Sequence, residues 1–320
     1  MFSTPVLFLI FNRPDTTIQV FEQIRKIKPA FLYVAADGPR STKPGESETC
    51  QQVRSLVLNG IDWDCKLITL IREENLGCGR AVSEAISWFF GQVEEGIILE
   101  DDTVPDLSFF RFCEEMLQKY KTDDHIIAIN GCNFNFSGEA STSYFLSKYM
   151  NVWGWATWKR VADKIDYNMR SWNKQSKLQF LWSRLRSSLT DFDLDWFRYW
   201  RNNFDAVSSK KIDTWDYQWQ YHQLLHNMNT VVAGRNLVIN LGFGEGATHT
   251  TRQTHLASNM RLEKLSFPLQ PLLTNIDSRY ETEVVKPVWH MLHSKPNSYY
   301  LLNSINTLPF VQTIRKKFKI

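Results

Sequence analysis

Three adjacent carboxylates are the residues best suited to chemistry. Glu100, Asp101 and Asp102 directly follow the apolar run 96–99, which predicts a buried strand. Neighbouring carboxylates repel one another unless a cation compensates their charge. Hard oxygen ligands suit Mg²⁺ or Mn²⁺, which usually take further oxygens from a bound diphosphate. The position after a strand therefore predicts a metal and diphosphate site, and the alternative is a cap for the helix expected from about Asp106.

Two more polar groups follow expected strands. Arg13 comes after the apolar run 6–11, and Asp37 comes after the run 31–36. Ligands of open α/β sheets bind outside the carboxyl ends of the strands, so these side chains are candidates for the same site. The alternatives are a surface ion pair for Arg13 and an ordinary Asp-Gly turn for Asp37.

The elements that must position these residues alternate between the hydrophobic patterns of strands and of helices. Apolar runs predict strands at 6–11, 31–36, 66–71, 96–99 and 125–130, and helical stripes lie at about 18–27, 82–89 and 106–117. We expect Asp15 to cap the first helix, and the residues after Pro39 form a polar stretch. The order β-α-β-β-α-β-α-β predicts an α/β fold with a mainly parallel, Rossmann-like sheet covered on both faces.

The second half of the chain is rich in tryptophan and has a different pattern. Helices are expected near 178–189, 192–204 and 217–228, and strands at 230–233 and 237–241, followed by a glycine-marked loop at 242–246. We therefore expect a donor-binding half (1–135), a Trp-rich α+β acceptor half within the same core (136–283) and a basic C-terminal segment (284–320).

Composition excludes several classes of protein. The chain has 320 residues, of which 43% are apolar and 22% charged, as in globular proteins. A net charge of +3 is too small for nucleic acid to be the main partner. Five cysteines without C-x-x-C spacing favour a reducing cytoplasm, and neither a signal peptide nor a transmembrane run is evident.

The C-terminal segment 284–320 contains six basic and no acidic residues. Together with its aromatic and aliphatic residues, this charge suits peripheral contact with an anionic membrane surface, here the inner face. The alternative is a solvated terminal helix that packs on the body of the protein.

Five motifs, in this order, resemble GT-A glycosyltransferases, and most closely the N-acetylglucosaminyltransferase I group. The resemblance extends over about residues 5–250. The segment 215–219 has one Asp where the family has two. The motifs are Asn75-Leu-Gly-Cys-Gly-Arg80, the run from Gly96 through Glu100-Asp-Asp to Phe110, Val152-Trp-Gly-Trp155, Trp215-Asp-Tyr-Gln-Trp219 and Gly244-Glu-Gly-Ala-Thr-His249.

The resemblance implies a donor site for a nucleotide sugar. Asp102 would contact the Mn²⁺ or Mg²⁺ ion directly, while Asp101 and Glu100 would face the ribose or the metal-bound waters. Arg13 and Asp37 would hold the base and ribose, and an acceptor such as Asp37 suits the N–H of uracil, which favours UDP. Further donor and metal contacts would come from Arg80 and His249; a lone histidine is also compatible with a structural role.

The resemblance also implies an inverting transfer to a glycan or lipid-linked glycan. Asp216 would be the general base, with a helix N-cap as its alternative role and Glu245 as the alternative base. Trp153, Gly154 and Trp155 would line the sugar site.

Two other functions remain open from the sequence. The missing second Asp favours a non-catalytic protein that binds glycans or nucleotides. A carboxylate site would also serve nucleotidyl or phosphoryl transfer, although the chain has no G-x-x-x-x-G-K-[ST] loop.

Overall fold

The fold is mixed α/β, as the computed structural model shows for residues 2–136, 142–172, 180, 194–242, 260–270 and 278–287. The strands are β1 (Val6–Ile10), β2 (Phe31–Ala36), β3 (Lys66–Ile71), β4 (Glu95–Glu100), β5 (Thr103–Pro105), β6 (Ile126–Asn130), β7 (Tyr144–Ser147), β8 (Trp155–Trp158), β9 (Asn229–Ala233) and β10 (Val238–Asn240). The helices are α1 (Pro14–Ile27), α2 (Glu46–Asn59), α3 (Cys78–Phe90), α4 (Leu107–Lys119), α5 (Lys159–Ala162), α7 (Leu194–Ser208), α8 (Asp216–Leu225), α10 (Ser278–Tyr280) and the π-helical turn η1 (Glu281–Val285).

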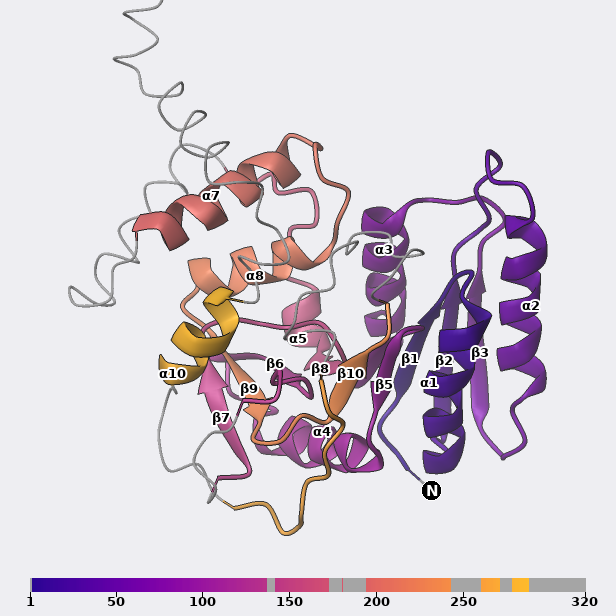
Figure 1. Ribbon diagram of the computed structural model, residues 1–320, viewed down its shortest axis with the longest axis horizontal. Coiled ribbons are helices and arrows are strands. Elements are labelled where there is room, and N and C mark those ends of the chain that lie inside the picture. The colour runs from indigo at the N-terminus through magenta and orange to yellow at the C-terminus, as the bar shows by residue number, and fades with distance from the viewer. Residues whose placement is uncertain are drawn as a thin grey trace, which may run out of the picture.

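One eight-stranded sheet organises the molecule, in the order β3-β2-β1-β4-β8-β6-β9-β7 (Figure 1). Parallel pairs join β3 to β2, β2 to β1, β1 to β4 and β6 to β9, whereas β8 and β7 run antiparallel to their neighbours. All five residues of β1 are buried, because helices cover both faces of the sheet. The α/β class and the mainly parallel sheet predicted from the sequence are confirmed, and this architecture is consistent with the GT-A type.

Helices pack on the two faces through the apolar stripes that the sequence predicted. Helix α1 contacts α2 and α4, while α3 contacts β1 and α5. Figure 1 shows α3 on one side of the parallel strands and α2 on the other. In α1 the buried side chains include Val20, Phe21 and Ile24, which share one face at helical spacing.

Two local predictions in the first half are wrong. Helix α2 occupies part of the segment after Pro39 that was expected to be a polar stretch. Its buried apolar residues Cys50, Val53 and Val57 do lie at helical spacing, as a short stripe among polar residues. At α1, the N-cap residue is Arg13, with Pro14 in the first turn, and Asp15 lies inside the helix. The proline sets the start of this helix because its fixed φ suits the first helical position.

The start of α4 rules out one alternative for the acidic cluster. Asp106 itself is the N-cap residue, and its carboxylate accepts a hydrogen bond from the Ser108 backbone at 2.8 Å. Pro105 ends the short strand β5, which pairs antiparallel with β10 so that Thr103 lies opposite Asn240. The carboxylates at 100–102 therefore do not cap this helix.

The second half of the chain contributes strands to the same sheet. Strand β8 lies between β4 and β6, and β9 and β7 follow at that end. The expected elements 192–204, 217–228 and 230–233 correspond to α7, α8 and β9, and α7 contacts α8 (Figure 1). Except for Phe180, the helix expected at 178–189 lies outside the described residues.

The C-terminal prediction falls largely outside the structure. Of the basic segment, only residues 284–287 are described. Within the described part of the chain, none of the helices combines the length and the hydrophobicity required to cross a bilayer.

A stability prediction follows from Gly154, whose φ is +66°. A Cβ at this position would lie 2.6 Å from Val238 Cγ2 in the core. We expect Gly154→Ala to lower the free energy of unfolding by about 3 kcal/mol, from backbone strain and overpacking together. Urea denaturation measures this, with Gly45→Ala as the matched control: its φ is +77°, and its Cβ would meet nothing within 4 Å. Equal losses for the two variants would contradict the packing argument.

A pH prediction follows from His222 on α8. Burial lowers its pKa from 6.5 to about 4, and the neighbouring charges of His226 and Lys164 contribute to the same shift. Below pH 6.5 the unfolded chain takes up a proton at this site that the folded protein does not bind. The histidine therefore destabilises the protein progressively as the pH falls from 6.5 to 4, by about 2 kcal/mol after allowance for its partial exposure. Equilibrium unfolding of His222→Gln should show a correspondingly flatter pH profile than the unmodified protein; parallel profiles would refute this.

Candidate active site

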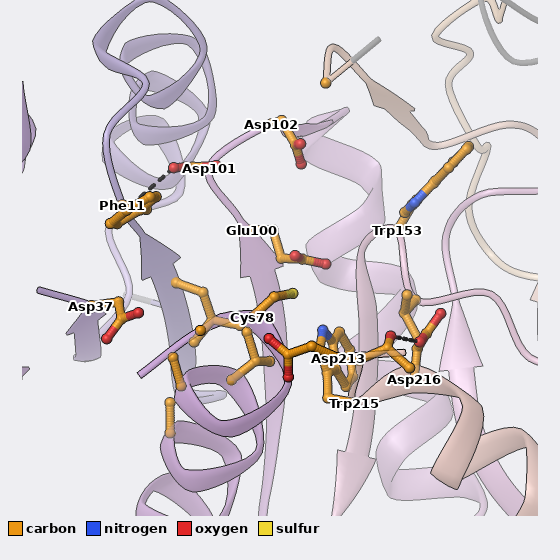
Figure 2. A pocket seen from close by; sticks show the side chains of 18 of the residues that line it. Phe11, Asp37, Cys78, Glu100, Asp101, Asp102, Trp153, Asp213, Trp215 and Asp216 are labelled. Carbon is orange, nitrogen blue, oxygen red and sulfur yellow. Dashed lines mark hydrogen bonds between the residues drawn. The ribbon is translucent and has the colours of Figure 1, made fainter. Parts of the chain in front are cut away.

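A cavity of about 690 Å³ opens at the carboxyl ends of β1, β2 and β4. Its lining comes from both halves of the chain, and Figure 2 shows the side chains converging from different elements. Among the lining residues are seven acidic and arginine side chains of the first half, Arg13, Asp37, Arg40, Arg72, Glu100, Asp101 and Asp102, and five residues of the second half, Trp153, Asp213, Trp215, Asp216 and Gly242.

The three carboxylates of the acidic cluster point to different partners. Asp101 accepts a hydrogen bond from the Phe11 backbone at 3.0 Å. Asp102 accepts one from the Arg13 guanidinium at 2.6 Å, and Asp101 lies 3.9 Å from the same guanidinium. The Glu100 carboxylate lines the cavity (Figure 2). Arg13 therefore faces three adjacent carboxylates. Its ion pair with Asp102 is half-buried, so it is not the exposed surface pair that was the alternative for this residue.

The acidic cluster carries more negative charge than the single Arg13 guanidinium compensates, and its burial makes that charge costly. Burial, followed by the negative charges of Asp102 and Asp101, raises the pKa of Glu100 well above its usual range. Burial and the charge of Asp102 raise the pKa of Asp101 to about 7, although Arg13 opposes the shift. The pKa of Asp102 is also raised by burial, against the opposing effect of Arg13. The cluster therefore favours the arrival of a positive charge.

The donor set fits a divalent cation that is completed by its substrate. In the described ranges, no three His, Cys, Asp or Glu side chains gather into a group that could enclose a metal ion. Magnesium-type ions commonly use only one or two protein carboxylates together with substrate phosphates and water. Asp102 meets that requirement, because it lines the cavity next to Asp101 and Glu100, whose negative charges favour a bound cation.

Asp37 binds the loop that precedes α3. Its carboxylate accepts hydrogen bonds from the Asn75 side chain at 2.9 Å and from the Leu76 backbone at 3.1 Å. Burial raises the pKa of Asp37, and the backbone donors of Leu76 and Gly38 oppose that shift. Asp37 therefore joins β2 to this loop and is more than an ordinary Asp-Gly turn.

Asp216 lies at the other end of the cavity, as the first residue of α8. The helix N-cap is Trp215, and Asp216 accepts a hydrogen bond from the Thr214 hydroxyl. Glu100 and Asp216 line the same cavity, and the negative charge of Asp216 contributes to the raised pKa of Glu100. Asp216 therefore does not serve as the side-chain cap of α8.

Of the three residues expected to line the sugar site, the cavity includes only Trp153. Its indole lies 5.3 Å from the Phe134 ring, edge to face. Trp155 is fully buried on β8 and stacks on Trp215 at 5.8 Å, so it belongs to the core. Gly154 packs against Val238 rather than the cavity. Burying large rings between β8 and α8 outweighs leaving them free to bind sugar.

Arg80 also lies outside the cavity lining. Its side chain is 67% exposed on α3 and pairs with Glu84 at 2.7 Å. The arginines that do line the cavity, besides Arg13, are Arg40 and Arg72. Neither was predicted from the sequence. Arg72 directly follows the strand expected at 66–71, which was an available signal, whereas Arg40 lies in the polar stretch after Pro39. Glu245 and His249 lie outside the described residues.

Asp213 is a further cavity residue that sequence analysis missed. Its carboxylate accepts a hydrogen bond from the Gly79 backbone at 3.1 Å, across 134 positions of the sequence. The one available signal was the glycine at 77, which leaves α3 without a capping side chain of its own.

Comparisons with known proteins add no assignment. No family model matches the chain, and no curated protein matches it. It is similar to mouse xyloside xylosyltransferase 1 (8% identity, TM-score 0.35, covering 70% of this chain and 82% of that chain). It is also similar to mannose-1-phosphate geranyltransferase from Thermus thermophilus (10% identity, TM-score 0.36, covering 73% of this chain and 74% of that chain). A third similar structure is HddC from Yersinia pseudotuberculosis (12% identity, TM-score 0.31, covering 52% of this chain and 81% of that chain). Such likenesses carry no functional argument, and none points to the N-acetylglucosaminyltransferase I group in particular.

Proposed function

We propose that the protein is an inverting glycosyltransferase that uses a nucleoside diphosphate sugar, with UDP as the favoured nucleotide. The observation that carries this proposal is that the buried acidic cluster at 100–102 and Asp216, from the other half of the chain, line the same cavity. The motif resemblance to GT-A enzymes supports the same reaction. The cavity suits two substrates, because the residues proposed to bind the nucleotide sugar lie at the strand ends and Asp216 lies across from them.

The strand ends supply the donor site in this proposal. Arg13 offers a guanidinium to phosphate or ribose oxygens, and Asp37 offers an acceptor to the base. Mn²⁺ or Mg²⁺ would be held by Asp102, with the remaining ligands from the diphosphate and water. Such an ion neutralises negative charge that develops on the departing diphosphate.

Asp216 is the proposed general base. In an inverting transfer, the acceptor hydroxyl attacks the anomeric carbon from the face opposite the diphosphate. The bond from that carbon to the diphosphate oxygen breaks, and the hydroxyl proton passes to the Asp216 carboxylate. Asp216 is itself only partly exposed and follows the buried Trp215, so solvent access to the base is reduced.

The acceptor in this proposal is a glycan or a lipid-linked glycan. Trp153, edge to face with Phe134, offers an aromatic surface of the kind that stacks on sugar rings. The peripheral membrane contact of segment 284–320 on the cytoplasmic face belongs to the same proposal. Flotation with anionic liposomes tests it: equal binding of the full chain and of a chain ending at residue 283 would remove its support.

The first test is a thermal-shift panel of UDP-, GDP-, CMP- and dTDP-sugars, each with Mn²⁺ or EDTA. Stabilisation follows occupancy, so a donor at ~100 times its Kd should add about 2.7 kcal/mol. We expect a metal-dependent shift with UDP-sugars, and release of UDP with an inverted anomeric linkage in the product. Release of a sugar phosphate would instead indicate phosphoryl chemistry, and no shift with any donor would favour a glycan-binding protein without turnover.

A further inference from the structure

The first turn of α3 lacks a cap from its own segment. Its N-cap residue is Gly77, which has φ +80° and no side chain to accept a hydrogen bond. The Asp213 carboxylate accepts from the backbone N–H of Gly79 at 3.1 Å, the second residue of the helix. An N-cap side chain normally accepts from this N–H or the next one. Asp213 therefore supplies, from a distant segment, the group that the local sequence omits.

The two glycines allow that segment to lie directly on the helix. A Cβ at Gly77 would lie 2.7 Å from Asp213 Oδ2, and a Cβ at Gly79 would lie 2.4 Å from Asp213 Oδ1. The Gly79 Cβ would also meet the backbone O and N of Thr214 at 2.9 and 3.0 Å. The contact is thus made by backbone as well as by a carboxylate, and it leaves no space for a side chain.

The same segment leads to Asp216. The Thr214 hydroxyl donates a hydrogen bond to the Asp216 carboxylate, and Asp213 and Asp216 face the cavity from one stretch of chain (Figure 2). On the donor side, Asp37 binds Asn75 and Leu76 at the start of the same loop. The loop 75–79 is therefore held by two carboxylates, one from each half of the molecule.

We propose that Asp213 is a positioning residue that docks the segment 213–216 onto the N-terminus of α3 and thereby fixes Asp216 toward the donor site. The partial positive charge at the N-terminus of this 13-residue helix strengthens the contact with a carboxylate. The effect on turnover rests on the proposed function of Asp216, whereas the docking itself does not.

Hydrogen exchange measured by mass spectrometry tests the docking without any substrate. In Asp213→Ala, the amides of residues 77–81 and 213–217 should exchange faster than in the unmodified protein, because the cap and the contact are lost together. Asp213→Asn keeps an acceptor oxygen and should remain close to the unmodified protein. Asp64→Ala is the matched control, since Asp64 is exposed in the loop before β3.

Steady-state kinetics test the consequence for transfer. A small displacement of a catalytic group costs on the order of 100-fold in rate, so kcat should fall by about that factor in Asp213→Ala. Asp213→Asn should recover most of the loss. Metal-dependent donor binding, which uses the 100–102 cluster, should stay within about threefold of the unmodified protein, so that the loss appears in kcat.

Unchanged exchange of both segments in Asp213→Ala would overturn the proposal, whatever the activity. This holds even where the Ala and Asn variants lose kcat equally. If the unmodified protein shows no transfer at all, the proposed function fails, and the exchange experiment still decides whether Asp213 docks the segment.

Discussion

Asp102→Asn is expected to abolish the metal-dependent stabilisation by a nucleotide sugar and to lower turnover roughly 100- to 1,000-fold. The substitution keeps the shape of the side chain and removes the charge that a divalent cation requires. Asp102 is the carboxylate bound most closely by Arg13, at 2.6 Å, and it lies in the cavity. Without it, the cluster loses its candidate direct ligand for the cation.

The stability of the unliganded protein should change little in this variant. Burial raises the pKa of Asp102 and of its neighbours, so removing one negative charge relieves repulsion. Arg13 loses its ion pair with this carboxylate at the same time, which offsets that gain. Thermal unfolding with and without Mn²⁺ and UDP-sugar therefore separates a lost binding site from a lost fold.

The matched control is Asp64→Asn, which removes an exposed carboxylate far from the cluster in sequence. It should retain the full ligand-induced shift, about 2.7 kcal/mol at ~100 times Kd. A shift of normal size in Asp102→Asn would remove Asp102 from the metal site and leave Asp101 and Glu100 as the remaining candidates.

Asp216→Asn is expected to lower kcat by about 1,000-fold while leaving donor binding intact. An amide cannot accept the acceptor proton, yet it can still accept the hydrogen bond from the Thr214 hydroxyl. Because Asp216 is the first residue of α8 and not its capping side chain, the helix should remain folded. The measurement is steady-state transfer alongside the thermal-shift assay for donor.

Two outcomes would contradict this role. Turnover near that of the unmodified protein would assign the proton transfer to another group, with Glu245 as the first candidate. Loss of donor binding in parallel with turnover would show that Asp216 acts on the donor rather than on the acceptor. Thr214→Val provides a useful companion, because it removes the hydroxyl that contacts Asp216 and leaves the carboxylate in place.

Local sequence patterns correctly predicted the features that depend on a single segment of the chain. The continuous apolar run at 6–10 forms a strand that is buried on both faces, and the acidic residues after 96–99 lie at the end of β4, as predicted. Such features can be read from sequence because side-chain periodicity and the position after a buried strand depend on neighbouring residues only.

Other features depended on contacts between distant segments. Strand β8 lies between β4 and β6, a pairing that a four-residue run cannot specify. Trp153 and Trp155 are of one type and two positions apart, yet one lines the cavity and the other is buried against Trp215. Their sequence spacing does not distinguish them, and only the packing of α8 decides which of them meets the core.

The sequence by itself determined the α/β class, the parallel half of the sheet and the acidic cluster at a strand end, because each follows from local hydrophobic pattern. Only the tertiary structure decided which polar residues converge on the cavity. Arg80 faces solvent beside Glu84, whereas Asp213, 134 positions from Gly79, caps α3. The physical reason is that a cap or a cavity is completed by whichever group the packing brings near, irrespective of its distance along the chain.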